Sequence, residues 1–508
     1  MNASITLLLA LLAAAATRGD EAELEWRFAA AVDGKRLLRT VRELTALGAR
    51  MGGTESGDAA AKYHAARFRA AGLEPVPTVD PELRAFQPNK LVANLVIADA
   101  TIELKDGALA LHTPGIGRTT LPLLLEPPAS AGDAPSSPYA LLVDAPTHGE
   151  QGPTAAAKAS AAFAGVTRLP RSARPRVVLV AFDQRVESST PVLHHGRDFE
   201  GTVLTISRRE AASLRAACAE APEADPELSI EAEVFDGPGH PITVLADVPG
   251  TAPAAGSGPP ILLFCAHGDS DSGSLGADDN ASGDAVVHEL AAVFAQLRDD
   301  AKDGKGGMAL PITLRFVVWG SEIHSTNNYI ARTRGDGSLA RHVAVVNFDQ
   351  AGTGAERDCI YFEPDDLPLN QPLVRLGLDV AQERVGRDGF WSEYTSNAAL
   401  GGTDSYCFSP GWRQGGAKGD LPAITIFSAA FGEAERTRVT EGFLSPGWKG
   451  EHDRIVVDYS KVYHETGDRP DVTTEAEPWN MEWVTKAAGL LALRLASSPE
   501  TVKKLLDR

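Results

Sequence analysis

The pattern of hydrophobic and polar positions divides the chain into three stretches. From about residue 24 to 80, apolar residues recur every three or four positions, which predicts helices over 37–48 and 59–72, the second ending at Gly72. From about 95 to 235, short apolar runs alternate with clusters of Pro, Gly, Ser and Asp, a pattern typical of strands joined by turns. These runs cover 91–98, 140–146, 176–183 and 202–207, with an Ala-rich helix over 154–165.

Beyond about residue 260, continuous apolar runs alternate with amphipathic helices. Strands are predicted over 261–267, 312–320, 342–349 and 423–429, and a helix follows the first of them over 284–297. Continuous apolar strands followed by helices indicate an α/β fold with a mostly parallel central sheet that helices cover on both faces. Ligands of such sheets gather beyond the carboxyl ends of the strands, so the residues that follow each run are the candidates for chemistry.

Composition and charge narrow the class of protein. The chain has 508 residues, of which 43% are hydrophobic and 23% charged, as in ordinary globular proteins. Its 68 acidic residues against 48 basic ones disfavour nucleic acids and membrane surfaces as partners. Four scattered cysteines without a C-x-x-C pair exclude a disulfide framework and a thiolate zinc knuckle. Cys265 lies in an apolar run and is expected to be a small core residue.

The N-terminus predicts export. Residues 5–16 form a largely apolar run that is too short to span a bilayer and suits the core of a signal peptide, which we place at 1–19. This segment lacks Lys and Arg before the run, and a buried first helix is the alternative. No other run approaches 18 apolar residues, so we expect a secreted or periplasmic protein without a membrane span.

Histidines and carboxylates follow successive predicted strands. In chain order they are His267, Asp269, Asp278, Asp279, Glu322, Asp349, His464 and Asp468. Imidazoles and carboxylates without thiolates fit a catalytic zinc site better than a structural one. Two imidazoles with several carboxylates are also enough for two zinc ions that share one carboxylate, at a separation of about 3.5–4 Å.

Other catalytic patterns are incomplete. His288 and Glu289 lack the second histidine of the H-E-x-x-H motif, and their place on an amphipathic helix predicts a surface position. Ser270 lacks the last glycine of a nucleophile elbow. His194 and His195 stand in a polar loop and are expected to be solvated. No Gly-rich phosphate loop opens a helix, so nucleotide binding has no support.

The strand-end series resembles the secreted two-zinc aminopeptidase family, which includes bacterial leucyl aminopeptidases and the plasma glutamate carboxypeptidase type. The motifs that carry the resemblance are His267-Gly-Asp, Gly276-Ala-Asp-Asp-Asn-Ala-Ser-Gly, Trp319-Gly-Ser-Glu, Asn347-Phe-Asp and Tyr463-His-x-x-x-Asp, and they span roughly 240–490. The resemblance implies a zinc exopeptidase fold with an inserted small α/β protease-associated domain. The implied division of the mature chain is 20–97 for the N-terminal part of the peptidase domain, 98–238 for the insert and 239–508 for the rest of the peptidase domain.

The resemblance also implies roles for single residues. Asp279 would bridge two zinc ions, His267 and Asp349 would complete one site, and His464 would belong to the other. Asp269 would orient the His267 imidazole, as metal-bound histidines generally require. Asp468 would support the loop of His464. Asp404, in Gly-Thr-Asp-Ser, resembles the family's segment near the substrate pocket.

One position departs from the family. The family has two adjacent glutamates after the strand that ends near Trp319, the first a general base and the second a zinc ligand. Here Glu322 is followed by Ile323, and the loop that follows is shorter. Aligned without a gap, Glu322 is the base and the second zinc loses a ligand; shifted by one, Glu322 is the ligand. His324 is a possible replacement ligand.

The sequence therefore predicts a secreted zinc-dependent exopeptidase that acts on peptides. Aminopeptidase action by metal-activated water is the leading interpretation, and carboxypeptidase action occurs on the same scaffold. The alternatives are a single-zinc enzyme like a glutaminyl cyclase and a catalytically inactive peptide-binding relative, in which a lost base or ligand leaves the fold intact.

Overall fold

The computed structural model describes residues 22–145, 165–182, 189–190, 192–193, 199–252, 258–270, 274–352, 358–396, 403–409, 419–430, 462 and 464–507. The predicted signal peptide, nearly all of the predicted helix over 154–165, and the pair His194 and His195 lie outside these residues.

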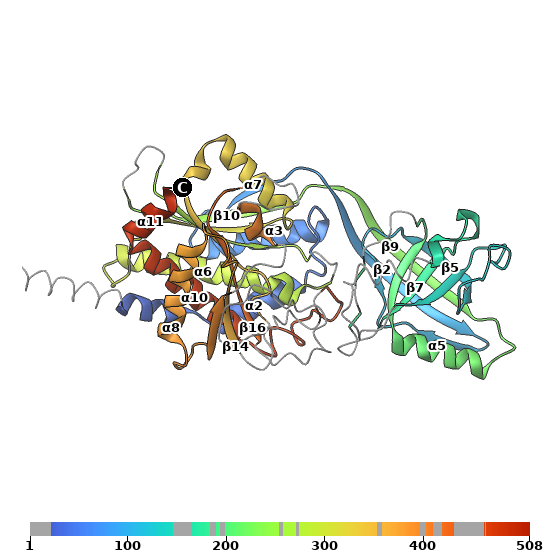
Figure 1. The fold of residues 1–508 in the computed structure, drawn as a ribbon. Helices are drawn as coiled ribbons and strands as arrows, with labels where there is room; N and C mark the ends of the chain where they lie inside the picture. Colours follow the sequence, from blue (N-terminus) through green and yellow to red (C-terminus); the bar gives the residue numbers. More distant parts are fainter. Residues whose placement is uncertain are drawn as a thin grey trace, which may run out of the picture.

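An eight-stranded sheet forms the centre of the larger lobe (Figure 1). Its strands, in spatial order, are β1 (Val76–Val79), β10 (Ile242–Val248), β12 (Thr313–Trp319), β11 (Ile261–His267), β13 (His342–Asn347), β16 (Ala423–Ala430), β14 (Asp358–Glu363) and β15 (Glu393–Ser396). The four central strands β12, β11, β13 and β16 run parallel to one another, and antiparallel pairings flank them. The predicted parallel core is confirmed.

Helices cover both faces of this sheet, which explains why its strands are apolar throughout. On β11, Leu262 and Phe264 pack into the large core on one face, while Leu263 and Cys265 pack into a smaller core on the other. Cys265 is buried, as predicted. The large core is formed with α2 (Gly34–Thr45), α3 (Glu55–Ala70), α6 (Gly283–Lys302), α8 (Gln371–Arg384), α10 (Trp479–Ala496), α11 (Pro499–Leu506) and the helix over 22–31. The smaller core lies under α7 (His324–Gly335) and α9 (Asp404–Phe408).

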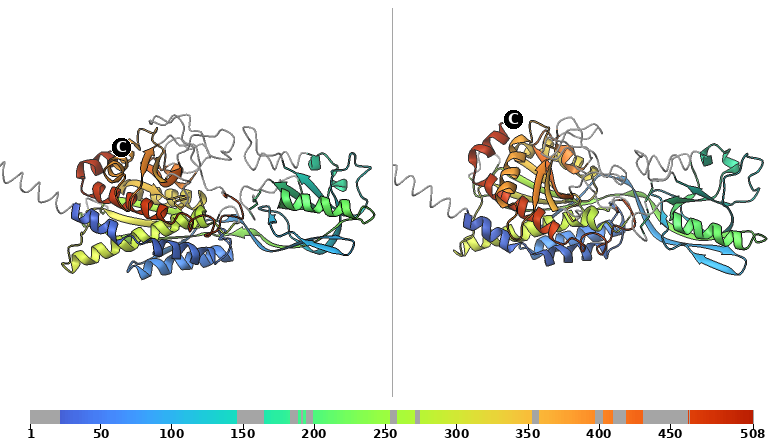
Figure 2. Two further views of the ribbon diagram at one scale, coloured as in Figure 1. Left: turned by 90° about the horizontal axis from the view of Figure 1, so that it is seen from below. Right: turned by 60° about the horizontal axis from the view of Figure 1, so that its bottom comes forward.

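A second eight-stranded sheet forms a separate lobe, with helix α5 (Arg208–Glu220) packed on it (Figure 2). Its spatial order is β3 (Ala100–Glu103), β2 (Leu83–Ile97), β9 (Glu227–Gly239), β5 (Ile116–Leu124), β6 (Ala140–Asp144), β7 (Val177–Phe182), β8 (Thr202–Ser207) and β4 (Ala108–Leu109). Two hydrophobic clusters give this lobe its own core. The sheet begins upstream of the predicted boundary at residue 98, and the domain limits stay a prediction.

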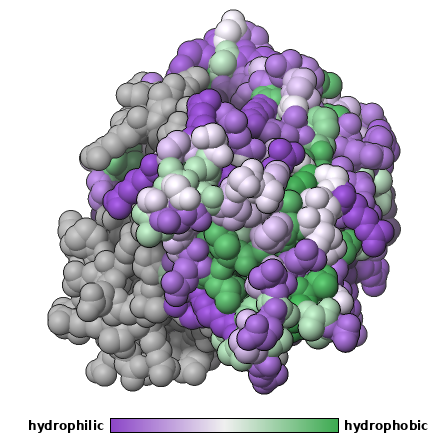
Figure 3. All heavy atoms as spheres, turned by 90° about the vertical axis from the view of Figure 1, so that its right-hand side faces the viewer, coloured by the Kyte–Doolittle hydropathy of each residue, from purple (hydrophilic) through white to green (hydrophobic). Residues whose placement is uncertain are grey.

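The two lobes are joined by a long antiparallel ribbon of β2 and β9. Their pairing runs from Leu83 opposite Gly239 to Val96 opposite Glu227, so the chain enters and leaves the second lobe on adjacent strands. Seen from the end that carries this lobe, the molecular surface is largely hydrophilic with apolar patches between polar side chains (Figure 3). Within the described part of the chain, no helix combines the length and the hydrophobicity that crossing a membrane requires.

The prediction that His288 and Glu289 lie on the surface is wrong. Both are buried on α6, because α2 and α3 cover that side of the helix. Glu289 accepts hydrogen bonds from the Arg36 guanidinium at 2.6 and 2.9 Å, and His288 Nε2 lies 2.9 Å from His64 Nδ1. We expected the polar side of this helix to face solvent. Instead, His288 and Glu289 contact polar side chains of α3 and α2.

Candidate metal centre

His267 is the last residue of β11, at the carboxyl edge of the parallel strands. Its Nδ1 lies 3.0 Å from the backbone oxygen of Asp269 and 3.3 Å from the Asp269 carboxylate. Held from this side, the imidazole presents Nε2 to the space beyond the strand end. A backbone or carboxylate partner on the second ring nitrogen is the usual support of a metal-bound histidine.

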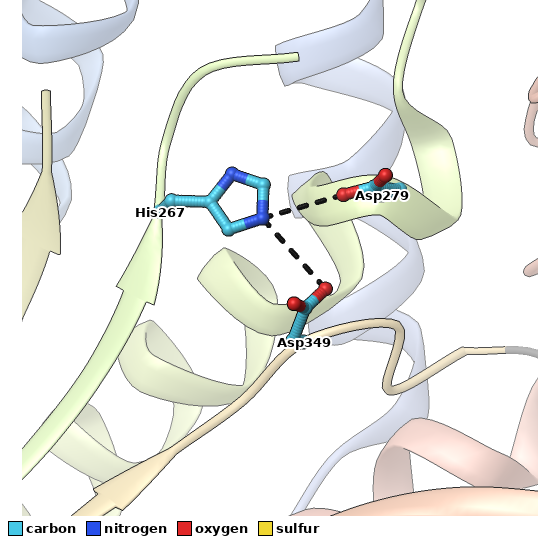
Figure 4. A group of neighbouring side chains, drawn as sticks. All are labelled: His267, Asp279 and Asp349. Atoms are coloured by element: carbon cyan, nitrogen blue, oxygen red, sulfur yellow. Dashed lines mark ion pairs between the residues drawn. The ribbon is translucent and has the colours of Figure 1, made fainter. Parts of the chain in front are cut away.

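The carboxylates of Asp279 and Asp349, which belong to two different loops, both face this Nε2 atom (Figure 4). Asp279 lies in the turn between β11 and α6, with Oδ1 3.3 Å from His267 Nε2. Asp349 follows β13, with Oδ1 3.7 Å from the same nitrogen. One potential ligand atom from each of the three residues lies within 4.8 Å of the others. The buried Oδ1 of Asp349 has no hydrogen-bond partner among the described residues, so it is available to a cation.

His464 reaches the same cluster from the C-terminal part of the chain. Its Nε2 lies 3.2 Å from Asp279 Oδ2, so the two oxygens of one carboxylate face two imidazoles, His267 on one side and His464 on the other. His464 has a positive φ of 54°, in the left-handed region that few non-glycine residues adopt. The structure thus brings together the four residues His267, Asp279, Asp349 and His464.

Burial and charge oppose each other at this cluster. Burial alone would lower the pKa of His267, but the surrounding carboxylates, Glu322 first among them, raise it well above its usual range. Burial alone would raise the pKa of Asp279, but its contacts with His267 and His464 hold it well below its usual range. Concentrated negative charge around two imidazoles at the edge of a sheet is an environment that attracts a cation.

Arg50, which the sequence reasoning missed, holds the two described ends of the segment between His267 and Asp279. Its guanidinium is fully buried and donates to the backbone oxygens of Gly268 at 3.3 Å, Leu275 at 2.6 Å and Gly276 at 2.9 Å. Burial lowers the pKa of Arg50, against the pull of surrounding aspartates. One guanidinium fork therefore ties both ends of the loop to the segment before α3.

Asp468 holds the backbone of the Asp279 turn. Its carboxylate accepts the backbone N–H groups of Asp278 at 2.8 Å and Asp279 at 3.0 Å. We expected Asp468 to support the His464 loop. Its side chain instead holds the Asp279 turn, while its backbone N–H donates to the Glu465 oxygen within the His464 loop. Burial raises the pKa of Asp468 to about 6.

Glu322 and Ile323 form a tight turn after β12. The Glu322 backbone N–H donates to Asp269 at 3.0 Å, and the His324 N–H donates back to the Glu322 oxygen at 2.5 Å, which closes a γ-turn around Ile323. Ile323 has a φ of 60°, and its side chain packs against the smaller core that contains Trp319. The side chain that the ungapped alignment places at the family's second glutamate therefore faces apolar side chains. Glu322 is not in the close three-residue group, although its charge acts on His267.

His324 and Asp404 lie beside the Glu322 turn. His324 Nε2 lies 2.9 Å from the backbone oxygen of Pro81, away from the close group. Asp404, fully buried, accepts the Ile323 N–H at 2.8 Å and the Thr326 hydroxyl at 2.5 Å. Burial raises the pKa of Asp404 to about 7. Its role in substrate binding stays a prediction, while its described contacts brace the turn that carries Glu322.

Residues 243–488 match the model of peptidase family M28. A peptidase M28 precursor from Shewanella amazonensis SB2B shares the fold with a TM-score of 0.60 and 15% identity, covering 94% of this chain and 96% of that one. BSAP, a zinc aminopeptidase from Bacillus subtilis, matches with a TM-score of 0.56 and 18% identity over 90% and 95% of the two chains. None of the curated proteins matches this chain. At these identities the likeness to solved structures concerns the fold.

Proposed function

Residues 243–488 form a peptidase family M28 domain, which makes this chain a metallo-exopeptidase hydrolase, and we propose that it is a secreted zinc aminopeptidase. The observation that carries the proposal is Asp279, whose two carboxylate oxygens lie 3.3 Å from His267 and 3.2 Å from His464. A carboxylate shared by two imidazoles is the arrangement that two neighbouring metal ions need.

The donor set of the cluster fits zinc. It offers imidazole and carboxylate donors without thiolates, and the buried Oδ1 of Asp349, which has no hydrogen-bond partner among the described residues, is a suitable ligand atom. In the proposal His267, Asp279 and Asp349 hold one zinc, and Asp279 and His464 hold a second. When bound, zinc lowers the pKa of water and polarises the carbonyl of the scissile bond.

Glu322 is the proposed general base. Its carboxylate would take a proton from the attacking water and return it to the nitrogen of the leaving group. Asp269 fixes the backbone of Glu322, and Asp404 fixes that of Ile323, so the turn holds the carboxylate beside the cluster without placing it among the close donors. The ungapped alignment at Trp319-Gly320 supports the base role over the ligand role.

The two zinc sites differ in the number of protein donors. Among the described residues, the site of His267, Asp279 and Asp349 has three, whereas the second site is assigned only Asp279 and His464, and the Ile323 side chain cannot add a carboxylate. We therefore propose that the first site binds zinc more tightly. The second candidate function is a catalytically inactive peptide-binding relative. If the second site binds zinc too weakly without a carboxylate from position 323, the chain would lose its activity and keep its fold.

Metal content and a dipeptide panel test the proposal together. We expect purified protein to contain zinc by elemental analysis, and to hydrolyse dipeptides with a free N-terminus but not the same dipeptides after N-acetylation. C-terminally amidated dipeptides are the matched control, and an aminopeptidase should still cleave them. Cleavage of acetylated but not amidated dipeptides would indicate a carboxypeptidase. Zinc content without any cleavage would favour the inactive relative.

Export is proposed from the N-terminal sequence. The apolar run over 5–16 and the small residues after it support a signal peptide over 1–19. N-terminal sequencing of the protein recovered from the culture medium or periplasm of an expressing host should begin after this segment.

A further inference from the structure

A short segment of the second lobe is hydrogen-bonded to the loop that carries His464. The Val192 N–H donates to the His464 oxygen at 3.0 Å. Two residues before Val192 and two residues after His464, a second pair is bonded: the Thr190 N–H donates to Thr466 Oγ1 and the Thr466 N–H donates to the Thr190 oxygen, both at 3.0 Å. The Ser189 hydroxyl donates to the Glu465 carboxylate at 2.5 Å. We call residues 189–190 and 192–193 the latch.

The latch is anchored in the second lobe. The Leu193 oxygen accepts the Leu111 N–H at 2.6 Å, and the Leu193 side chain is buried in a hydrophobic cluster of that lobe with β6 and β7. Val192 packs with Phe86 of β2 and with Leu111. The latch is therefore packed into the second lobe, although it is also hydrogen-bonded to the peptidase domain.

The contacts between the latch and the His464 loop are buried and close. Ser189 is 0% exposed and Glu465 is 2% exposed. A Cβ atom added to Gly467 would lie 2.4 Å from the Ser189 hydroxyl, so the loop approaches the latch as closely as glycine allows. Removal of the Glu465 carboxylate would take away the acceptor of the buried Ser189 hydroxyl, which is costly.

His464 needs such support. Its left-handed backbone is unfavourable for a non-glycine residue. Such conformations persist where the surroundings determine them. The Glu465 N–H closes the turn on the Val462 oxygen at 2.9 Å, and the Val192 N–H satisfies the His464 oxygen from outside. The bonded series then runs from the core of the second lobe through Val192 and His464 to Asp279.

We propose that the latch is a positioning element of the metal centre, which sets His464 for zinc and couples the second lobe to occupancy of that site. This inference rests on the proposed function, because it assigns the latch a role toward zinc. In the proposed assignment Ile323 takes the place of the second glutamate, so among the described residues the site of His464 has fewer donors and the external hold on His464 matters more. Coupling of this kind is reciprocal, so zinc bound at His464 should stabilise the latch.

Hydrogen exchange of the whole protein tests this reciprocity. Exchange of the Thr190 and Val192 amide hydrogens is measured by mass spectrometry with and without zinc, while calorimetry follows zinc uptake. At zinc about 100-fold above its Kd, we expect both amides to exchange up to about 100-fold more slowly. The Val203 amide, which donates to Thr113 Oγ1 inside the second lobe, should not respond to zinc.

The outcomes separate the two proposals. Zinc uptake without slower exchange at Thr190 and Val192 overturns the latch and leaves the zinc peptidase standing. Absence of zinc uptake overturns both. Slowing that disappears in His464→Ala, with uptake at the other site retained, places the coupling at His464.

Variants of the latch test the same inference by affinity. Ser189→Ala combined with Thr466→Val removes one donor and one acceptor, and should weaken zinc binding at the His464 site by about 10–100-fold, as loss of supporting partners generally does. Replacing Thr466 by Ser instead of Val keeps the hydroxyl acceptor, so much of the zinc affinity should be restored. Thr202→Val, which removes a hydroxyl bonded to the Pro114 oxygen within the second lobe, is the matched control. Unchanged zinc affinity in the Ser189→Ala/Thr466→Val variant, or equal loss in the control, overturns the latch.

Discussion

The carboxylate of Asp468 accepts the backbone N–H of Asp279 at 3.0 Å, across 189 positions of sequence. Two acidic residues can lie this close because the contact is made through an N–H group, whose partial positive charge stabilises the Asp468 carboxylate. The arrangement leaves the Asp279 carboxylate free to face the two imidazoles. A residue outside the proposed ligand set thus orients the residue at its centre.

Replacement of Asp279 should empty the metal centre. Because the Asp279 carboxylate lies beside both His267 and His464, Asp279→Ala removes a donor from both proposed zinc sites. We expect elemental analysis to find at most traces of zinc in the variant and one to two ions per chain in the parent. Asp299→Ala, at an exposed position of α6, is the control and should keep the parental zinc content. Equal zinc in the Asp279→Ala variant and the parent would contradict the proposed ligand set.

The proton-transfer role of Glu322 can be separated from a ligand role. Glu322→Gln keeps the shape of the side chain but cannot accept a proton, so kcat should fall by about 10²–10⁴-fold while zinc content is unchanged. Assay at saturating zinc distinguishes the cases. Activity that returns with excess zinc would mean that Glu322 is a ligand, and full activity without added zinc would remove it from the mechanism.

Restoring a glutamate at Ile323 should not restore a zinc ligand. The Ile323 side chain packs against apolar residues, so Ile323→Glu would place a carboxylate where it finds no partner, and we expect a loss of about 1–3 kcal/mol in the free energy of unfolding. Zinc stoichiometry should stay unchanged. Ile323→Leu keeps an apolar side chain of the same volume and serves as control for the backbone strain. A gain of zinc in the Ile323→Glu variant would show that the turn can present this side chain to the cluster.

Asp284 should make stability depend on pH. Burial raises its pKa to about 8, against the opposing charge of Arg50, and neither carboxylate oxygen has a hydrogen-bond partner among the described residues. The unfolded chain loses this proton near pH 3.9, so the contribution of Asp284 to stability is fully present below that pH and is lost as pH rises towards 8.

Asp284→Asn should remove this dependence. The free energy of unfolding of the variant minus that of the parent should increase from about pH 4 to about pH 8 and then level off. Urea unfolding at several pH values, on protein stripped of metal, measures the difference. A difference that stays constant across this range would mean that Asp284 is ionised in the folded protein.

The parallel strands explain why much of the site could be predicted. His267 ends β11 and Asp349 follows β13, and because these neighbouring strands run parallel, chain order alone places the two residues at one edge. The fold class follows from the same continuous apolar runs. His464 lies on an irregular loop and not at the end of a parallel strand, so its place after the last predicted strand made it a candidate, and the resemblance to a known family assigned it to the second zinc.

Other features depend on contacts that leave no periodic pattern. Arg50 looks like a surface charge in a Gly-rich turn, yet it is buried because three backbone oxygens surround its guanidinium. His288 looks exposed on its helix, yet it meets His64 across two helices. The bonds between Thr190 and Thr466 join residues 276 positions apart, and neither local sequence predicts them.

The antiparallel pairing of β2 and β9 makes the second lobe, in topological terms, an elaborated hairpin. Leu83 and Gly239 face each other at its base, at the spacing of adjacent strands, about 5 Å. A two-residue turn could therefore close the ribbon near its base and excise the whole lobe without cutting a strand of the main sheet. The shortened chain would keep His267, Asp279 and Asp349 on their original elements, yet the backbone oxygen of His464 would lose its donor. The second lobe, which the topology would allow to be removed as a unit, therefore supplies a hydrogen bond to a residue of the proposed metal centre.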